Sequence, residues 1–238
     1  MTITGGTDGL FVATEGTHVT LRSSIVSGQK PPSAGLSNRS RGASAVDGGL
    51  LTIERSIFRD IVADAALVGD AGSVEASETV IHGVRVDGNA ARGHGISVTA
   101  AGHIKMRASA IVDAESIGVF GKDLGSSLEL LDTVVRGPAK SGTVPTATFL
   151  VSSERSGIGL EITTGAKATV ENSAIVDSWA YGAYADTTAA MTKTRSTLTM
   201  KTSLIENTRP SPGRPRRPSP SASGSCRPAP PSPSTTSE

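Results

Sequence analysis

The amino-acid sequence predicts an all-β fold in which short strands stack coil upon coil as a solenoid. The first observation is a repeat, because "IKMRASAIVD" at 104–113 returns as "ATVENSAIVD" at 168–177. The second is an alternation of apolar and polar residues at a period of two, which is typical of strands. The third is composition, since 27 glycines and 3% aromatic residues indicate many turns and a core of small, β-branched side chains.

The repeated phrase has ten residues and reads apolar-x-apolar-x-x-Ser/Thr-x-apolar-x-Asp/Asn/Gly. It fits seven ranges, namely 19–28, 51–60, 74–83, 104–113, 128–137, 168–177 and 198–207. Its sixth position always carries a hydroxyl, on Ser24, Ser56, Thr79, Ser109, Thr133, Ser173 and Ser203. Two positions later the residue is always apolar. Because all seven copies keep both columns, we interpret the phrase as the unit of a repeat protein.

A second phrase precedes each copy and consists of Gly or Ala followed by a short alternating run, as in "GISVTAAG" and "GLEITTG". Each unit is therefore predicted to be a short strand, a Gly-bearing turn, a second short strand and another turn. The shortest distances between hydroxyl positions are 23 and 24 residues, which set the basic unit. A unit this small buries its apolar face only by stacking on its neighbours.

Over residues 9–207, this repeat resembles the right-handed parallel β-helix proteins of the pectate-lyase-like solenoid superfamily. The resemblance implies an all-β, single-stranded right-handed parallel β-helix of about seven coils across residues 1–208. In that fold like positions of successive coils lie above one another, about 4.8 Å apart. The first and third positions of the phrase would then point inward, and the charged residues between them outward.

Outward positions of neighbouring coils carry opposite charges. Arg22 is predicted to lie over Glu54, Lys105 between Glu75 and Glu129, and Glu171 over Lys201. Such cross-strand pairs contribute roughly 0.2–1 kcal/mol each, so we interpret them as surface pairing.

The last position of the phrase alternates between Gly and Asp until the final copy, which has Asn. Gly precedes every long connection and Asp precedes the short ones. Asp and Asn suit a tight left-handed turn, whereas Gly lets the chain depart into a loop. Asp60, Asp113 and Asp177 are thus predicted to be turn residues. On alternate coils they would lie about 10 Å apart, and paired glycosidase carboxylates need roughly 5–9.5 Å.

Three long connections, 28–41, 83–94 and 137–158, are predicted to leave the same corner on every second coil. Loops on a rigid solenoid commonly carry binding. These loops have a net charge of +5, whereas the rest of the chain before residue 209 has −8. Positive charge along one edge favours an acidic polysaccharide. The candidate ligand-binding residues are Arg39, Arg41, Arg85, Asp87, Arg92, His94, Lys140 and Arg155.

The leading functional hypothesis is a non-catalytic secreted or cell-surface β-helix protein that binds acidic polysaccharide through these loops. The alternative is a divergent polysaccharide lyase or glycoside hydrolase of the pectate-lyase-like superfamily. A third is a truncated gene product without activity of its own. Polygalacturonase-like members carry Asn-Thr-Asp, Asp-Asp and Arg-Ile-Lys motifs; none occurs here, so no catalytic residue is assigned. The resemblance implies an extracellular or cell-surface location, although the sequence shows no signal peptide pattern.

We expect no cofactor and no metal, because the single Cys and the four His form no recognisable ligand set. We expect no specific nucleic-acid partner, no membrane span and either a monomer or part of a longer chain. Residues 209–238 hold 9 of the 13 prolines and five arginines, with almost no aliphatic residues. That composition predicts a disordered Pro/Ser/Arg-rich tail. Both a proline-rich linker and an out-of-frame translation would explain it.

Overall fold

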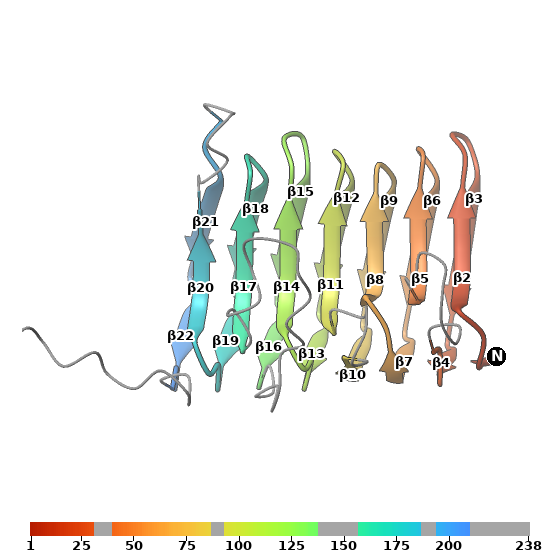
Figure 1. The fold of residues 1–238 in the computed structure, drawn as a ribbon, viewed down its shortest axis with the longest axis horizontal. Helices are drawn as coiled ribbons and strands as arrows, with labels where there is room; N and C mark the ends of the chain where they lie inside the picture. Colours follow the sequence, from red (N-terminus) through yellow and green to blue (C-terminus); the bar gives the residue numbers. More distant parts are fainter. Residues whose placement is uncertain (31–39, 87–92, 138–156, 187–193, 210–238) are drawn as a thin grey trace, which may run out of the picture.

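The computed structural model describes residues 1–30, 40–86, 93–137, 157–186 and 194–209. Within these ranges the chain forms 22 strands and no helix. The strands make three sheets, here called A, B and C, in which every neighbouring pair is parallel (Figure 1). The coils succeed one another along the long axis of the molecule, as the colours of Figure 1 show. The structure thus confirms a right-handed parallel β-helix.

The strands of each sheet follow in spatial order. Sheet A contains β1 (Thr2–Thr4), β4 (Ile25–Ser27), β7 (Ile57–Val62), β10 (Val80–Arg85), β13 (Ala110–Val112), β16 (Val134–Arg136), β19 (Ala174–Val176) and β22 (Leu204–Glu206). Sheet B contains β2 (Asp8–Ala13), β5 (Arg41–Val46), β8 (Ala65–Asp70), β11 (His94–Thr99), β14 (Ile117–Lys122), β17 (Ile158–Thr163) and β20 (Tyr181–Ala185). Sheet C contains β3 (His18–Arg22), β6 (Leu50–Glu54), β9 (Ser73–Ser77), β12 (His103–Arg107), β15 (Ser127–Leu131), β18 (Lys167–Glu171) and β21 (Thr197–Lys201).

Each coil runs through sheet B, then sheet C, then sheet A, and seven such coils follow β1. The count agrees with the seven copies of the phrase. The prediction of two strands per unit is wrong, because the phrase spans two strands and the coil has three. The chain bends just before each hydroxyl, at a residue with φ between 47° and 50°. These left-handed corner residues are Ser23, Arg55, Glu78, Ala108, Asp132, Asn172 and Thr202.

The hydroxyl column stabilises this corner. Each hydroxyl donates to the carbonyl oxygen two residues earlier, at 2.7 to 2.9 Å in all seven coils. In four coil pairs the hydroxyl also accepts from the backbone N–H of the preceding coil's hydroxyl residue. These bonds run from Ser24 to Ser56, Thr79 to Ser109, Thr133 to Ser173 and Ser173 to Ser203. The column therefore closes each corner and links it to its neighbour.

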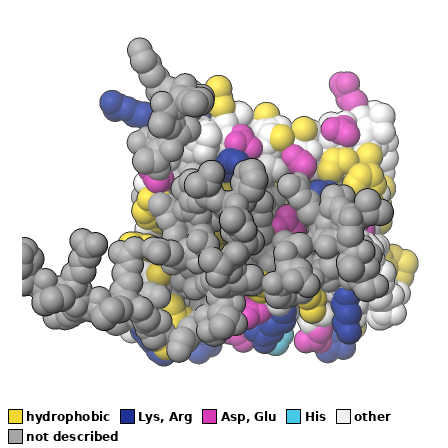
Figure 2. Space-filling model, viewed as in Figure 1, with side chains coloured by type: hydrophobic (Ala, Val, Ile, Leu, Met, Phe, Trp, Pro, Cys, Tyr) yellow, Lys and Arg dark blue, Asp and Glu magenta, His cyan; other side chains and the backbone are white. Residues whose placement is uncertain are grey.

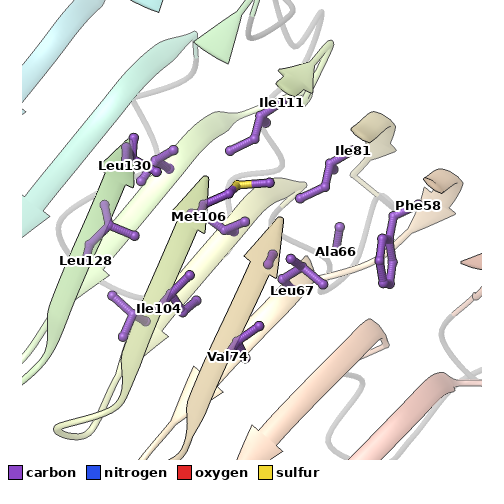
Figure 3. Packing of buried hydrophobic residues seen from close by; sticks show 14 of the residues in the cluster. Phe58, Ala66, Leu67, Val74, Ile81, Ile104, Met106, Ile111, Leu128 and Leu130 are labelled. Carbon is purple, nitrogen blue, oxygen red and sulfur yellow. The ribbon is translucent and has the colours of Figure 1, made fainter. Parts of the chain in front are cut away.

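The core consists of inward columns in register, as predicted from the first and third positions of the phrase. Leu51 pairs with Val74, Val74 with Ile104, and Ile104 with Leu128. Figure 3 shows Val74, Ile104 and Leu128 of this column, and Met106 and Leu130 of the next, meeting between the sheets. Phe58 is the one aromatic residue in the core of the described chain. Aliphatic side chains therefore supply nearly all of the buried apolar surface.

A column of glycines at the second position of the sheet B strands lets sheet B approach sheet A. The column is Gly9, Gly42, Gly95, Gly118, Gly159 and Gly182, with Ala66 in the third coil. A Cβ on Gly118 would lie 2.5 Å from Cγ1 of Val135 and 2.7 Å from the carbonyl oxygen of Gly159. The Gly or Ala that opens the second phrase is therefore required by space, not by turn conformation.

The last position of the phrase is left-handed in every coil, for Gly and Asp alike. Values of φ are 55°, 55° and 59° at Asp60, Asp113 and Asp177, and 73° and 69° at Gly28 and Gly83. The left-handed conformation predicted for these aspartates is confirmed; Asp113 and Asp177 each follow the end of a strand, whereas Asp60 lies inside β7. Two of the predicted charge pairs also form, because Arg22 Nε lies 2.9 Å from Glu54 and Lys105 Nζ lies 3.4 Å from Glu129.

Substituting Gly118 with Ala should lower the free energy of unfolding by about 1–3 kcal/mol, because the new methyl overpacks against Val135 and backbone. Chemical denaturation followed by circular dichroism measures the change. Gly16→Asn is the matched control, since nothing lies within 4 Å of a Cβ there and Asn tolerates its φ of 81°. Equal stability of Gly118→Ala and the wild type would contradict the packing role of the glycine column.

Substituting Ser109 with Ala should destabilise the protein by about 1–3 kcal/mol, because the buried N–H of Thr79 loses its acceptor at 3.0 Å. Ser109→Thr keeps the hydroxyl and should retain most of the stability. Chemical denaturation midpoints of Ser109→Ala and Ser109→Thr, each compared with the wild type, measure the two losses of stability. Equal losses in both would show that side-chain volume, and not the hydroxyl, is what the corner requires.

Candidate functional site

The three long connections share one corner of the solenoid. They leave sheet A after β4, β10 and β16 and enter sheet B at β5, β11 and β17. In sheet A these strands alternate with β7, β13 and β19, so the connections lie on every second coil. The predicted common corner is confirmed. The loop bounds were too wide, because 83–85 belong to β10, and residues 41, 94 and 158 each begin a strand.

Three of the eight predicted ligand-binding residues are described, and all three lie at the stems of these connections. Arg41 is the first residue of β5, Arg85 the last of β10 and His94 the first of β11. Arg41 and His94 both align with Ala65, so they lie in one column two strands apart. Arg39, Asp87, Arg92, Lys140 and Arg155 lie outside the described residues.

The outer face of sheet B is formed by two columns of side chains that point away from the core. The first residue of each strand makes one column, namely Asp8, Arg41, Ala65, His94, Ile117, Ile158 and Tyr181. The fourth residue makes the other, namely Phe11, Ser44, Val68, Ser97, Phe120, Glu161 and Tyr184. Ile117, Phe120 and Ile158 form an apolar cluster separate from the main core.

His94 lies on this outer face in a buried position. Its side chain is 4% exposed, and its ring centroid lies 4.9 Å from that of Phe120. Its backbone N–H donates to the carbonyl of Asp64 at 3.0 Å, which fixes the start of β11. The imidazole therefore packs as part of the sheet surface and does not stand in solvent.

Arg41 neighbours Asp8 in register on this face. Burial raises the pKa of Asp8 above its ordinary value of 3.8, and the guanidinium and backbone N–H of Arg41 partly offset that rise. The Nε atom of Arg41 is buried and has no hydrogen-bond partner. A buried donor without an acceptor is costly, and a bound anion would supply the acceptor.

Aromatic residues collect along sheet B instead of in the core. Of the seven aromatic residues in the sequence, Phe11, Phe120, Tyr181 and Tyr184 lie on its outer face. Trp179 lies two residues before β20, at the corner between sheets A and B. Exposed aromatic side chains on a soluble surface are typical of recognition sites.

Two pairs of side chains lie in or next to β20, Trp179 with Arg209 and Tyr181 with Tyr184, and we call this region the aromatic corner. The Arg209 guanidinium carbon lies 5.4 Å from the ring centroid of Trp179, and the two tyrosine centroids are 5.4 Å apart. Tyr181 is 49% exposed, so one flat ring is open to solvent. The Tyr184 hydroxyl donates to Oδ2 of Asp186 at 2.8 Å, which holds its ring in place.

Asp177 positions the cations of this corner. Its Oδ2 lies 3.2 Å from Nε of Arg136, and its Oδ1 lies 3.8 Å from a terminal nitrogen of Arg209. The same turn position in coil four holds Asp113, 3.5 Å from Nε2 of His82. Figure 2 shows basic and acidic side chains together along its lower edge, where Figure 1 places sheet A. Charges of both signs are therefore interspersed on this side of the described chain.

A depression lies at the corner between sheets C and A. It is an open groove lined by Asp132, Thr133, Val134, Asn172, Ser173, Ala174, Thr202, Ser203 and Leu204. The hydroxyls of Thr133, Ser173 and Ser203 belong to the column described above, and Asp132, Asn172 and Thr202 are the left-handed residues before them, so the groove follows from the repeated corner of the coils. In the ranges described, no three His, Cys, Asp or Glu residues gather as metal ligands. The described chain also has no helix with the length and apolarity to cross a membrane.

Comparison with known proteins adds no relative to this picture. No family model matches the chain, and neither a curated protein nor a solved structure matches it. The architecture is therefore established by the strands and their register alone.

Sequence reasoning missed the aromatic corner. The signal was available, because "WAYGAY" at 179–184 places three of the seven aromatic residues within six positions. Attention to charge in the loops favoured the Arg and Lys residues instead. In a chain with so few aromatic residues, their clustering is the stronger indication of a binding surface.

Substituting Asp8 with Asn should change how stability depends on pH. The pKa of Asp8 in the folded state is raised above 3.8. The contribution of the Asp8 carboxyl to the free energy of unfolding is therefore fully present below pH 3.8 and is lost as the pH rises through the pKa of the folded state. The stability of Asp8→Asn relative to wild type should therefore increase from acid to neutral pH, and the increase should be modest because the Asp8 carboxyl is only partly buried and still reaches solvent.

Thermal unfolding at a series of pH values measures this difference. Arg41→Gln removes the cation that opposes the rise, so the pH at which stability is lost should move upward in that variant. A difference between Asp8→Asn and wild type that stays constant with pH would contradict the assignment.

Proposed function

We propose that the protein is a non-catalytic secreted or cell-surface β-helix protein that binds acidic polysaccharide. The binding side is the corner between sheets A and B, where the connections 28–41, 83–94 and 137–158 begin and end. Membership of the pectate-lyase-like superfamily belongs to the same proposal. It rests on the resemblance of the repeat and on the three-sheet coil.

The observation that carries the proposal is the aromatic corner. Tyr181 offers an exposed ring on which the apolar face of a pyranose can stack, and Trp179, two residues earlier in the chain, contacts the Arg209 guanidinium. Guanidinium groups bind carboxylates with two parallel hydrogen bonds, which suits the acid group of a uronic acid. Stacking plus a cation is the combination that an acidic sugar requires.

The connections that leave this corner are rich in positively charged residues in sequence. Their net charge of +5 contrasts with the acidic remainder of the solenoid. Arg41 at the first stem has a buried Nε without a partner, which an anionic group would satisfy. Because the coils repeat about every 4.8 Å, stems on alternate coils would contact a chain lying along the solenoid about every 10 Å.

The test is binding of the full chain to polygalacturonate and alginate, with neutral dextran as the reference, by isothermal titration calorimetry. Tyr181→Ala should weaken binding about tenfold, equivalent to about 1.4 kcal/mol. Tyr181→Phe keeps the ring and should bind nearly as wild type. Binding should also fall as salt is raised, since exposed charges are screened. Equal affinity for dextran, or no loss in Tyr181→Ala, would overturn the proposal.

One observation favours the alternative, a divergent polysaccharide lyase or glycoside hydrolase. Glu161 is a carboxylate on the outer face of sheet B, 2% exposed and in register with Tyr184, whose hydroxyl donates to Asp186. Acids and a phenol side by side are groups that transfer protons in such reactions. Release of unsaturated uronate ends or new reducing ends, abolished in Glu161→Gln, would replace the first proposal with this one.

A further inference from the structure

The two ends of the solenoid expose matching surfaces. Coil seven comprises β20, β21 and β22, and no described strand pairs with its outer edge. Its inward residue Ile205 is 42% exposed, whereas the equivalent Ile175 one coil earlier is 1% exposed. At the other end no described strand pairs with the outer edges of β2 and β3, and Leu10 and Val19 are only partly buried. Unpaired edges over open apolar columns favour pairing with another strand.

We propose that copies of this chain associate end to end, with coil seven of one copy stacked on coil one of the next. The partner is a second copy because the same columns already form six coil-to-coil interfaces inside the chain. In sheet C, Leu198 would lie over Val19 and Met200 over Leu21, which are apolar pairs like those within the core. In sheet B, Ala183 would lie over Leu10.

The glycine column, the outer aromatic positions of sheet B and the hydroxyl column also match across this junction. Gly182 would lie over Gly9, and only such small residues fit there, since a Cβ on Gly159 would approach the Gly182 carbonyl oxygen to 2.5 Å. Tyr184 would lie over Phe11, which is 53% exposed in the free end. The N–H of Ser203 would donate to the hydroxyl of Ser24, as Ser173 does to Ser203 at 3.3 Å.

Strand β1 occupies the place that the incoming β22 would take. Thr2, Ile3 and Thr4 align with Ile25, Val26 and Ser27 of β4, in the same way that β22 aligns with β19. An incoming copy must therefore displace β1. The displaced strand has 3 residues, whereas the arriving coil pairs β20, β21 and β22 with 5, 5 and 3 residues. The exchange gains two strand pairings and covers both open apolar ends.

One pair opposes the junction. Lys201 would lie over Arg22, and like charges opposite each other are unfavourable. Because salt screens exposed charges, association should strengthen as ionic strength rises. The contact joins different surfaces of the two copies, so it extends into open chains of increasing length and does not close as a dimer.

Sedimentation velocity of the full chain over a concentration series tests the proposal. Ile3→Asp loosens β1 from the core and should raise the association constant about tenfold. Ile205→Asp should abolish association, alone and combined with Ile3→Asp. Circular dichroism checks that each variant keeps its strands. A folded Ile3→Asp that associates no better than wild type, or association that survives Ile205→Asp, overturns the proposal.

Disulfide trapping gives a second measurement that does not depend on loosening β1. With Cys226 changed to Ser, the pair Leu204→Cys and Ile25→Cys places thiols on adjacent strands of the junction, in one outward column. Oxidation should yield a ladder of covalent oligomers on a denaturing gel. The control pair Leu204→Cys and Val80→Cys uses the same column in the wrong coil and should give no ladder. Equal products from both pairs would overturn the end-to-end register.

Discussion

The structure depends on one constraint, which is that every coil must repeat the height and register of the coil beneath it. A single left-handed residue before each hydroxyl turns the chain from sheet C into sheet A, at φ values that span only 47° to 50°. None of these residues is glycine, so the conformation costs free energy on its own. The hydroxyl that bridges back two residues and the bond to the next coil offset that cost. Parallel strands can then pair over seven coils without a change of register.

This constraint explains how much of the fold could be predicted. The hydroxyl column and the inward apolar columns each repeat one type of residue in every coil, so their stacking could be inferred from the amino-acid sequence alone. The third strand could not, because the corner residue varies among Ser, Arg, Glu, Ala, Asp, Asn and Thr and carries no compositional signal. What the corner requires is a backbone conformation, and the residue after it provides the stabilising bond. The packing role of the glycine column could not be predicted either, because the space at each glycine is limited by residues distant in the sequence, such as Val135 beside Gly118.

The candidate site was less accessible to sequence reasoning, for a related physical reason. Arg41 and His94 were chosen for charge and for their position beside long connections. Each proves to begin a strand, so its surroundings are set by neighbouring coils such as those of Asp8 and Phe120. An aliphatic core also leaves little room for aromatic rings, and only Phe58 occupies it in the described chain. The remaining described rings lie on the outer face of sheet B or at the corner beside it, outside the main core.

The same columns that hold the coils together make the two ends of the molecule compatible. Inside the chain, the outermost position of the sheet C strands brings opposite charges together, as in Arg22 with Glu54 and Glu171 with Lys201. At the ends that position carries Lys201 and Arg22, which would repel each other across the proposed junction. The core of an end-to-end junction is thus favourable while its rim is not, and β1 covers part of the edge as well. The repulsion between Lys201 and Arg22 and the pairing of β1 with β4 both lie outside the apolar columns. Ionic strength and the stability of the three-residue strand β1 would therefore control association without any change in the core.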